Sequence, residues 1–300
     1  MNERSARWQR FAVRSVAWRN GLDWAVENVP FYCLPFLIFF WTLFFFLFAR
    51  KARQTVVHHL GIILPGSQGV VNYFRALRIF ANFAWTLTET ATYKLKRAAF
   101  SCQVEGREFL NRLVEGREAI LLTAHMGSYD LGAALFTEKF RRSIRMVRAP
   151  EPDKLAAEHV DLALDRVAAG AVKVAYSGEG AAVSFEILNA LREGEIVSLQ
   201  GDRALDTVAS APVQLFGRTV SLPNGPFVLG LITAAPIYPL FVVRIGYRKY
   251  KIIVREPIAC ARTAESREEA VQAAMQCWSQ VLETEIKEHW DQWYAFARIL

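Results

Sequence analysis

A histidine and an aspartate close together in the sequence are the side chains best suited to chemistry. His125 follows the apolar run 119–124, and Asp130 stands five positions later, where a helical pattern begins. On a single strand or helix, side chains at this spacing point apart. A turn at Gly127 removes the difficulty, because glycine adopts the backbone angles of tight turns and the helix start then folds back beside the strand end. The pair then predicts a general base, His125, oriented by the Asp130 carboxylate, with a hydroxyl as nucleophile.

The spacing alone is weak evidence for a catalytic pair, and the position of His125 at a strand end strengthens it. A chain with five histidines and 29 acidic residues produces such a spacing easily by chance, so a purely structural His125 stays an open alternative. Ligands of open α/β sheets, however, bind at the carboxyl ends of strands. Asp202 and Arg203 directly follow another apolar run, 195–200, and are candidates for lining the same cleft. A solvated loop pair is the alternative for these two residues.

Other chemistries are disfavoured by their missing patterns. The segment 178–183 has valine at the third glycine position of a dinucleotide loop, which favours a plain helix entry. Ser128 and Ser177 lie in no G-x-S-x-G elbow, which disfavours a serine hydrolase. His159 and His289 have no metal-ligand spacing, and the four cysteines form no CxxC pair. We therefore expect neither a metal nor a resident cofactor.

The elements around these residues alternate between strands and helices. Short apolar runs typical of strands are 119–124, 143–148, 171–176, 195–200, 237–244 and 250–255. Helical patterns are 69–98, 129–140, 153–169, 181–193, 224–233 and 263–289. This alternation predicts an α/β fold with a mixed, largely parallel central sheet flanked by helices.

An uncharged segment near the N-terminus predicts a membrane anchor. Residues 29–49 contain no charge and eight phenylalanines, and a helix of that length reaches across a bilayer core. The prolines Pro30 and Pro35 keep a bent, interfacial insertion open as an alternative to a true span. A buried core helix and a cleaved signal peptide are further, weaker alternatives. We therefore expect a basic N-terminus and hydrophobic anchor helix at 1–54, followed by a catalytic domain at 55–300.

Composition indicates the class of partner. The chain has 36 basic and 29 acidic residues, and its net charge of +7 favours anionic partners such as phospholipid headgroups or an acidic carrier protein. A basic run interleaved with aromatic residues is missing from the polar part of the sequence, so nucleic acid is not expected. The scattered cysteines suit reduced thiols in a cytoplasmic domain.

Several motifs occur together in a recognisable order. They are His125 with Asp130, RMVRAP with Arg148, LREGEIVSLQGDR with Asp202 and Arg203, LFGRTVSLPNGPF (215–227) and HWDQWYAF (289–296). In this order and spacing the chain resembles the bacterial lipid A biosynthesis acyltransferases of the lauroyl/myristoyl type, and the related phosphatidylinositol-mannoside acyltransferases, over nearly its whole length. Trp290 stands where the family has proline, and we expect this departure not to touch catalysis.

The resemblance implies a membrane-associated acyltransferase. It would move a fatty acyl chain from a thioester of acyl carrier protein or coenzyme A to a lipid or glycolipid acceptor, such as a lipid A precursor. The resemblance gives His125 and Asp130 the catalytic roles. It implies that Arg148 and Arg203 bind acceptor phosphates or carrier phosphopantetheine, and that Asp202 assists positioning. The turn at Gly225 would deliver backbone N–H groups to the ligand or, as the alternative, simply begin a helix.

The expected location and the rival functions follow from the same resemblance. Acyl thioesters are cytoplasmic, so we expect an inner-membrane protein whose catalytic domain faces the cytoplasm. A glycerolipid or lysophospholipid acyltransferase is the nearest rival, but its Phe-Pro-Glu-Gly type of block is missing from the sequence. A non-catalytic lipid-binding protein on the same fold is the other rival. The acceptor, the chain length and the carrier stay open.

Overall fold

The computed structural model describes residues 16–67, 69–148, 172–176, 181–204, 208–260 and 266–300. The helix expected at 153–169 lies outside the described residues, as do the basic residues that precede position 16.

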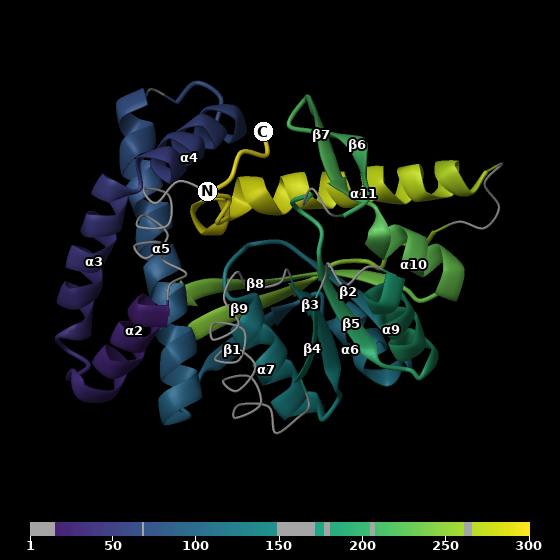
Figure 1. Cartoon of the computed structure of the whole chain (residues 1–300), viewed down its shortest axis with the longest axis horizontal. Helices are drawn as coiled ribbons and strands as arrows, with labels where there is room; N and C mark the ends of the chain where they lie inside the picture. The colour runs from purple at the N-terminus through teal and green to yellow at the C-terminus, as the bar shows by residue number, and fades with distance from the viewer. Residues whose placement is uncertain (1–15, 68, 149–171, 177–180, 205–207, 261–265) are drawn as a thin grey trace.

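A seven-stranded sheet forms the centre of the protein (Figure 1), in the order β1-β9-β8-β2-β5-β3-β4. Its strands are β1 (Ser101–Glu105), β2 (Ala119–Thr123), β3 (Ile144–Arg148), β4 (Val172–Tyr176), β5 (Ile196–Gln200), β8 (Ile237–Gly246) and β9 (Lys249–Val254). Among the described strands of this sheet, β8 and β9 pair antiparallel and the other neighbours pair parallel. The mixed, largely parallel sheet expected from the sequence is confirmed.

Strand β2 lies at the middle of the sheet and is buried along its whole length. Because successive side chains of a strand point to opposite faces, Ile120 and Leu122 pack into one hydrophobic cluster and Leu121 packs into another. The first cluster includes residues of α9 (Ala181–Arg192), α10 (Gly225–Thr233) and α11 (Arg267–Glu288). The second includes residues of α6 (Arg107–Glu115) and α7 (Tyr129–Phe140). Helices therefore cover both faces, which explains why the strand is a continuous apolar run.

Helix α11 crosses the molecule (Figure 1) and begins with a capping box. The Ser266 hydroxyl accepts from the Glu269 backbone N–H, and the Glu269 carboxylate accepts from the Ser266 N–H. These two bonds satisfy donors that a helix start otherwise leaves unpaired. A two-stranded hairpin of β6 (Ser210–Leu215) and β7 (Arg218–Pro223), which the sequence patterns did not predict, packs on α11. The chain ends after the short 3-10 helix η1 (Trp290–Gln292).

Four helices gather at one end of the sheet (Figure 1, purple to blue). They are α2 (Val16–Asn28), α3 (Leu34–Phe48), α4 (Arg50–Ile63) and α5 (Gly69–Lys96). A third hydrophobic cluster joins α3, α4 and α5 to Tyr294 near the C-terminus. The expected boundary at 54/55 falls inside α4. The division into an anchor and a catalytic domain stays a prediction.

The expected anchor segment 29–49 contains a shorter helix than the sequence predicted. Helix α3 begins only at Leu34, with Pro35 in its first turn, where proline's missing N–H costs nothing. At about 1.5 Å per residue its 15 residues span about 22 Å, less than a bilayer core of about 30 Å. Within the described ranges, no single helix combines the length and apolarity of a membrane span, and the pair α3 and α4 does so only across a 90° bend.

Candidate active site

The loop between β2 and α7 presents His125 at the carboxyl end of the central strand. Gly127 has a positive φ of 56°, and a Cβ there would lie 1.9 Å from the backbone oxygen of Val242. Ser128 then donates its backbone N–H to the same oxygen at 2.8 Å, and α7 begins at Tyr129. The turn that the sequence required at Gly127 is therefore present, and only glycine fits it.

The imidazole of His125 contacts Asp202. His125 Nδ1 lies 2.8 Å from Asp202 Oδ1, and the His125 backbone N–H donates to Asp202 Oδ2 at 3.1 Å. Strand pairing explains the contact, because Thr123 at the end of β2 is in register with Gln200 at the end of β5. The residues that come two positions after each strand therefore meet at the same edge of the sheet.

Gly201 allows the two strand ends to approach closely. Its backbone N–H donates to the Thr123 oxygen at 2.8 Å, and its own oxygen accepts from the Trp278 indole at 2.9 Å. A Cβ at this position would come within 2.7 Å of Leu122 Cδ1 and 3.0 Å of the Trp278 nitrogen. A larger residue would therefore force Leu122, Trp278 or the Gly201 backbone to shift.

The Asp202 carboxylate is completely buried and charged. Burial by itself raises the pKa of Asp202, but the nearby His125 and the N–H donors of His125 and Trp293 outweigh it, so the pKa lies below its ordinary value. The Trp293 indole donates to Asp202 Oδ2 at 3.0 Å. A charged acceptor at Nδ1 places the imidazole proton there, which leaves His125 Nε2 as the basic nitrogen.

Asp130 does not contact the imidazole, so the prediction of a hydrogen bond between Asp130 and His125 is wrong. The Asp130 carboxylate pairs with the guanidinium of Arg148 at the end of β3, at 3.1 and 3.4 Å. Two parallel contacts of this kind match the fork of an arginine to both carboxylate oxygens. Asp202 is the carboxylate that contacts the imidazole, in the place that the sequence predicted for Asp130. The importance of Asp130 and Arg148 for activity stays a prediction.

Arg203 lies on the other side of the imidazole. Its Nη2 is 3.4 Å from His125 Nε2, so a positive charge faces the basic nitrogen. Its Nε is buried and has no hydrogen-bond partner among the described residues. These contacts place Asp202 and Arg203 beside His125, and their expected role in lining a substrate cleft stays a prediction.

Gly225 begins α10, with Asn224 as the N-cap and Pro226 in the first turn. The Asn224 oxygen accepts from the N–H groups of Phe227 and Val228. The contacts found in the described ranges do not join Gly225 to His125, and its expected ligand role stays a prediction.

The segment 292–294, which begins at the last residue of η1, lies against the histidine loop, which the sequence did not predict. Gly127 donates its backbone N–H to the Gln292 oxygen at 3.0 Å, and Tyr294 donates to the His125 oxygen at 2.7 Å. With the Trp293 indole on Asp202, this segment lies directly against the histidine loop. The available signal was the C-terminal motif HWDQWYAF, whose order along the chain carried the family resemblance but whose contacts no spacing could show.

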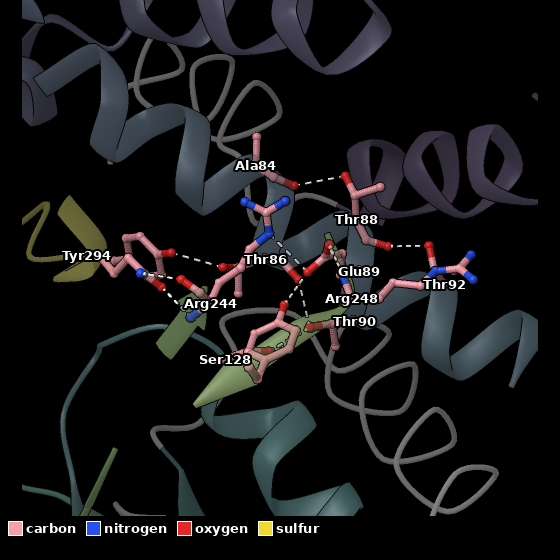
Figure 2. A network of polar contacts seen from close by, with 12 residues as sticks. Ala84, Thr86, Thr88, Glu89, Thr90, Thr92, Ser128, Arg244, Arg248 and Tyr294 are labelled. Carbon is pink, nitrogen blue, oxygen red and sulfur yellow. Dashed lines mark hydrogen bonds and ion pairs between the residues drawn. The ribbon is translucent and has the colours of Figure 1, made fainter. Parts of the chain in front are cut away.

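Helix α5 supports both sides of this arrangement through a polar network (Figure 2). Thr90 contacts the Ser128 hydroxyl at 3.0 Å, and Thr86 contacts the Tyr294 hydroxyl at 2.9 Å. Between them, the buried Glu89 accepts from Arg244 Nε of β8 at 3.1 Å. The network fixes the histidine loop and the C-terminal segment to the same helix.

Two further features lie outside these contacts. An apolar cavity between α7 and the sheet, bordered by Tyr129 and Phe136, has a volume of about 30 Å³, which suits about two water molecules and not a fatty chain. At the end of α11, Glu285, Glu288 and His289 bring possible metal-ligand atoms within 4.8 Å of one another. Glu285 is already bound by Arg255 at 2.6 Å. The expectation of no metal and no cofactor stays a prediction.

Comparison with known proteins shows which family the chain belongs to. The family model for bacterial lipid A biosynthesis acyltransferases matches residues 9–300. The chain belongs to this family. A search of curated proteins found no match to the chain. Membership makes this protein an acyltransferase that acts on lipid A-type substrates, with an acyl donor and a lipid acceptor as its partners. Lipid A biosynthesis acyltransferases are generally membrane-associated.

Proposed function

We propose that this acyltransferase transfers a fatty acyl chain from a thioester to a hydroxyl of a lipid A-type acceptor, with His125 as general base and Asp202 as the carboxylate that orients it. The observation that carries the proposal is the 2.8 Å contact between His125 Nδ1 and the buried Asp202 Oδ1. A base held by a charged partner, with its other nitrogen turned away from that partner, is the arrangement that acyl transfer to a hydroxyl requires.

The steps of the reaction follow from the second ring nitrogen of His125, Nε2. His125 Nε2 takes the proton of the acceptor hydroxyl while the oxygen attacks the thioester carbonyl carbon. The tetrahedral intermediate then collapses, the carbon–sulfur bond breaks, and the imidazolium returns the proton to the thiolate. Asp202 stabilises the imidazolium without taking its proton. Acyl carrier protein and coenzyme A both supply such a thioester, and the net charge of +7 suits an acidic carrier.

Arg203 and Arg148 supply positive charge around the base. Arg203 faces His125 Nε2 at 3.4 Å and therefore stands where the acceptor hydroxyl must arrive. An anionic group of the substrate draws the guanidinium away from Nε2 and frees the base. Arg148, held in place by Asp130, adds a second cation at the same sheet edge for phosphates of the acceptor or of phosphopantetheine. Asp130 thus acts through Arg148, and its loss affects substrate binding more than proton transfer.

We also propose that α3 docks the enzyme on the surface of the inner membrane, with the active site toward the cytoplasm. The buried residues of α3 form one stripe against the rest of the protein. Its other faces expose bulky side chains, namely Phe36, Leu37, Phe39, Phe40, Phe44, Leu47 and Phe48. An exposed apolar surface of this kind marks a membrane or protein contact. The short helix and its bend against α4 favour an interfacial insertion over a span.

The experiment compares purified variants in transfer of a radiolabelled acyl chain from acyl carrier protein to a lipid A precursor. We expect His125→Ala to lower kcat about 10²–10⁴-fold, and Asp202→Asn to lower it up to about 10⁴-fold. Asp130→Asn is expected to raise KM more than it lowers kcat. His58→Ala, at an exposed histidine of α4, is the matched control and keeps normal turnover.

The result that would overturn the mechanism is near-normal kcat in a folded His125→Ala protein. Equal kcat losses in Asp130→Asn and Asp202→Asn would remove the specific role of Asp202. Replacing the carrier thioester by coenzyme A thioester in the same assay identifies the donor. Mass spectrometry of membrane lipids with and without the gene then shows which lipid gains which chain.

A further inference from the structure

The indole of Trp293 completes the surroundings of the Asp202 carboxylate. Oδ1 contacts His125 Nδ1 at 2.8 Å, while Oδ2 accepts from the Trp293 indole at 3.0 Å and from the His125 backbone at 3.1 Å. Asp202 is fully buried and Trp293 is only 3% exposed. Because both partners are buried, water cannot easily take the place of the indole donor. The plane of the carboxylate is therefore set by one histidine and one tryptophan.

We propose that Trp293 is a positioning residue for acyl transfer, whose indole N–H holds the Asp202 carboxylate so that Oδ1 faces His125 Nδ1. This inference rests on the proposed role of Asp202 and His125 and adds a residue to it. Trp293 acts through Asp202 and is not in contact with the reacting atoms.

The indole can hold the carboxylate because its own backbone is fixed on both sides. The Gln292 side chain accepts from the Arg244 backbone N–H at 2.7 Å and donates to the Arg244 oxygen at 2.8 Å. On the other side, the Tyr294 hydroxyl contacts Thr86 of α5 at 2.9 Å (Figure 2). Strand β8 and helix α5 therefore lock the segment from which the indole points. A side chain on a mobile terminus could not set an angle in this way.

The groups around the Asp202–His125 pair decide how it titrates. Arg203 after β5 faces the imidazole, and His59 of α4 lies against the Trp293 ring at 5.3 Å between centroids. The indole itself carries no charge at any pH of interest, so it acts only as a donor. Removing a donor from a buried carboxylate makes that carboxylate more basic. A more basic Asp202 stabilises the imidazolium that forms during the reaction, so loss of the indole donor changes how catalysis depends on pH.

The test is Trp293→Phe in the full-length enzyme, which keeps an aromatic ring and removes the N–H. Hydrogen bonds to charged groups are worth enough that we expect kcat to fall about ten- to a hundredfold, with KM within about twofold. The acid limb of the kcat profile is expected to move upward by about one pH unit. Loss of packing alone would lower activity without moving that limb.

Trp278→Phe is the matched control, because Trp278 is fully buried and its indole donates to the neutral Gly201 oxygen at 2.9 Å. It makes the same change of indole to phenyl ring and loses an N–H donor beside the same loop, but not a donor to a carboxylate. We expect it to lower stability and to leave the acid limb of the profile where it is. An upward shift of equal size in both variants would overturn the proposal.

A measurement on the unmodified protein keeps the proposal testable if Trp293→Phe does not fold. In wild-type enzyme labelled with ¹⁵N-tryptophan, the Trp293 indole N–H resonance is expected to shift with pH at the midpoint of the acid limb. A chemical shift that stays constant across this pH range would overturn the proposal. Failure of wild-type enzyme to transfer acyl groups would instead overturn the proposed function, whereas normal wild-type turnover with an unmoved limb in Trp293→Phe would overturn the role of Trp293 alone.

Discussion

Acid is expected to weaken the protein through His59, a buried histidine of α4. His59 is 2% exposed, and its Nε2 accepts the backbone N–H groups of Ile299 at 3.2 Å and Leu300 at 3.4 Å. A nitrogen that accepts cannot carry a proton, so this geometry requires a neutral ring. Burial, with the charge of His58 as the second cause, lowers the pKa of His59 from 6.5 to about 4.

The sign and size of the effect follow from that pKa. In the unfolded chain His59 is protonated near pH 6.5, whereas in the folded protein it is protonated only near pH 4. The stability contribution is therefore complete above pH 6.5 and is lost as the pH falls from 6.5 to about 4. One pKa unit corresponds to about 1.4 kcal/mol, which makes the full loss about 3 kcal/mol. Protonation would also release the C-terminal residues that His59 holds.

The assay measures the free energy of unfolding in denaturant at pH 7.5 and pH 4.5 for wild type and His59→Gln. Glutamine keeps an acceptor for the two N–H groups but does not titrate, so the variant is expected to lose about 2–3 kcal/mol less than wild type over this range. His58→Gln removes only the second cause of the low pKa, so its loss is expected to fall between those of wild type and His59→Gln. Parallel losses in wild type and His59→Gln would refute the reasoning.

Two further predictions concern the N-terminal helices. Glu89→Gln is expected to destabilise the protein by about 3–5 kcal/mol in denaturant unfolding, because it leaves the Arg244 guanidinium without its buried counter-charge; a loss below about 1 kcal/mol would contradict a structural role for the pair. Replacing Phe36 and Phe40, 69% and 65% exposed on α3, by serine is expected to weaken sedimentation with anionic phospholipid vesicles more than tenfold. Phe185→Ser, 64% exposed on α9, is the control and should bind as wild type does, and equal binding by all three proteins would contradict docking through α3.

Local patterns determined most of the elements. Runs such as 119–124 and 195–200 became β2 and β5 within one residue of each end, because a strand buried on both faces must be continuously apolar. The helix start at 129 was equally readable, since a glycine turn and an acidic first turn precede its apolar face. The hairpin of β6 and β7 was missed because many of its residues are exposed, so its strands are not continuous apolar runs. Its second strand also lies within the motif 215–227, which ends in a turn.

The apolar segment 29–49 shows which structural features composition can predict and which it cannot. Its uncharged, phenylalanine-rich run predicted an anchor helix, and α3 exposes much of that apolar surface. The prolines decided that the helix begins only at Leu34. The 90° bend between α3 and α4 goes together with the packing of both helices on α5, and it was not readable from hydropathy.

The sequence by itself determined that His125 ends a buried strand beside a glycine turn, because both features are local. It could not determine the partner of the imidazole, since that depends on which strand lies next to β2 and in which register. Pairing of β2 with β5 places Asp202 against the His125 imidazole, while Asp130 pairs with Arg148. Trp293 reached the same carboxylate only because the chain returns along α11 to the histidine loop. These contacts join residues far apart in sequence, and only the folded sheet brings them within hydrogen-bond distance.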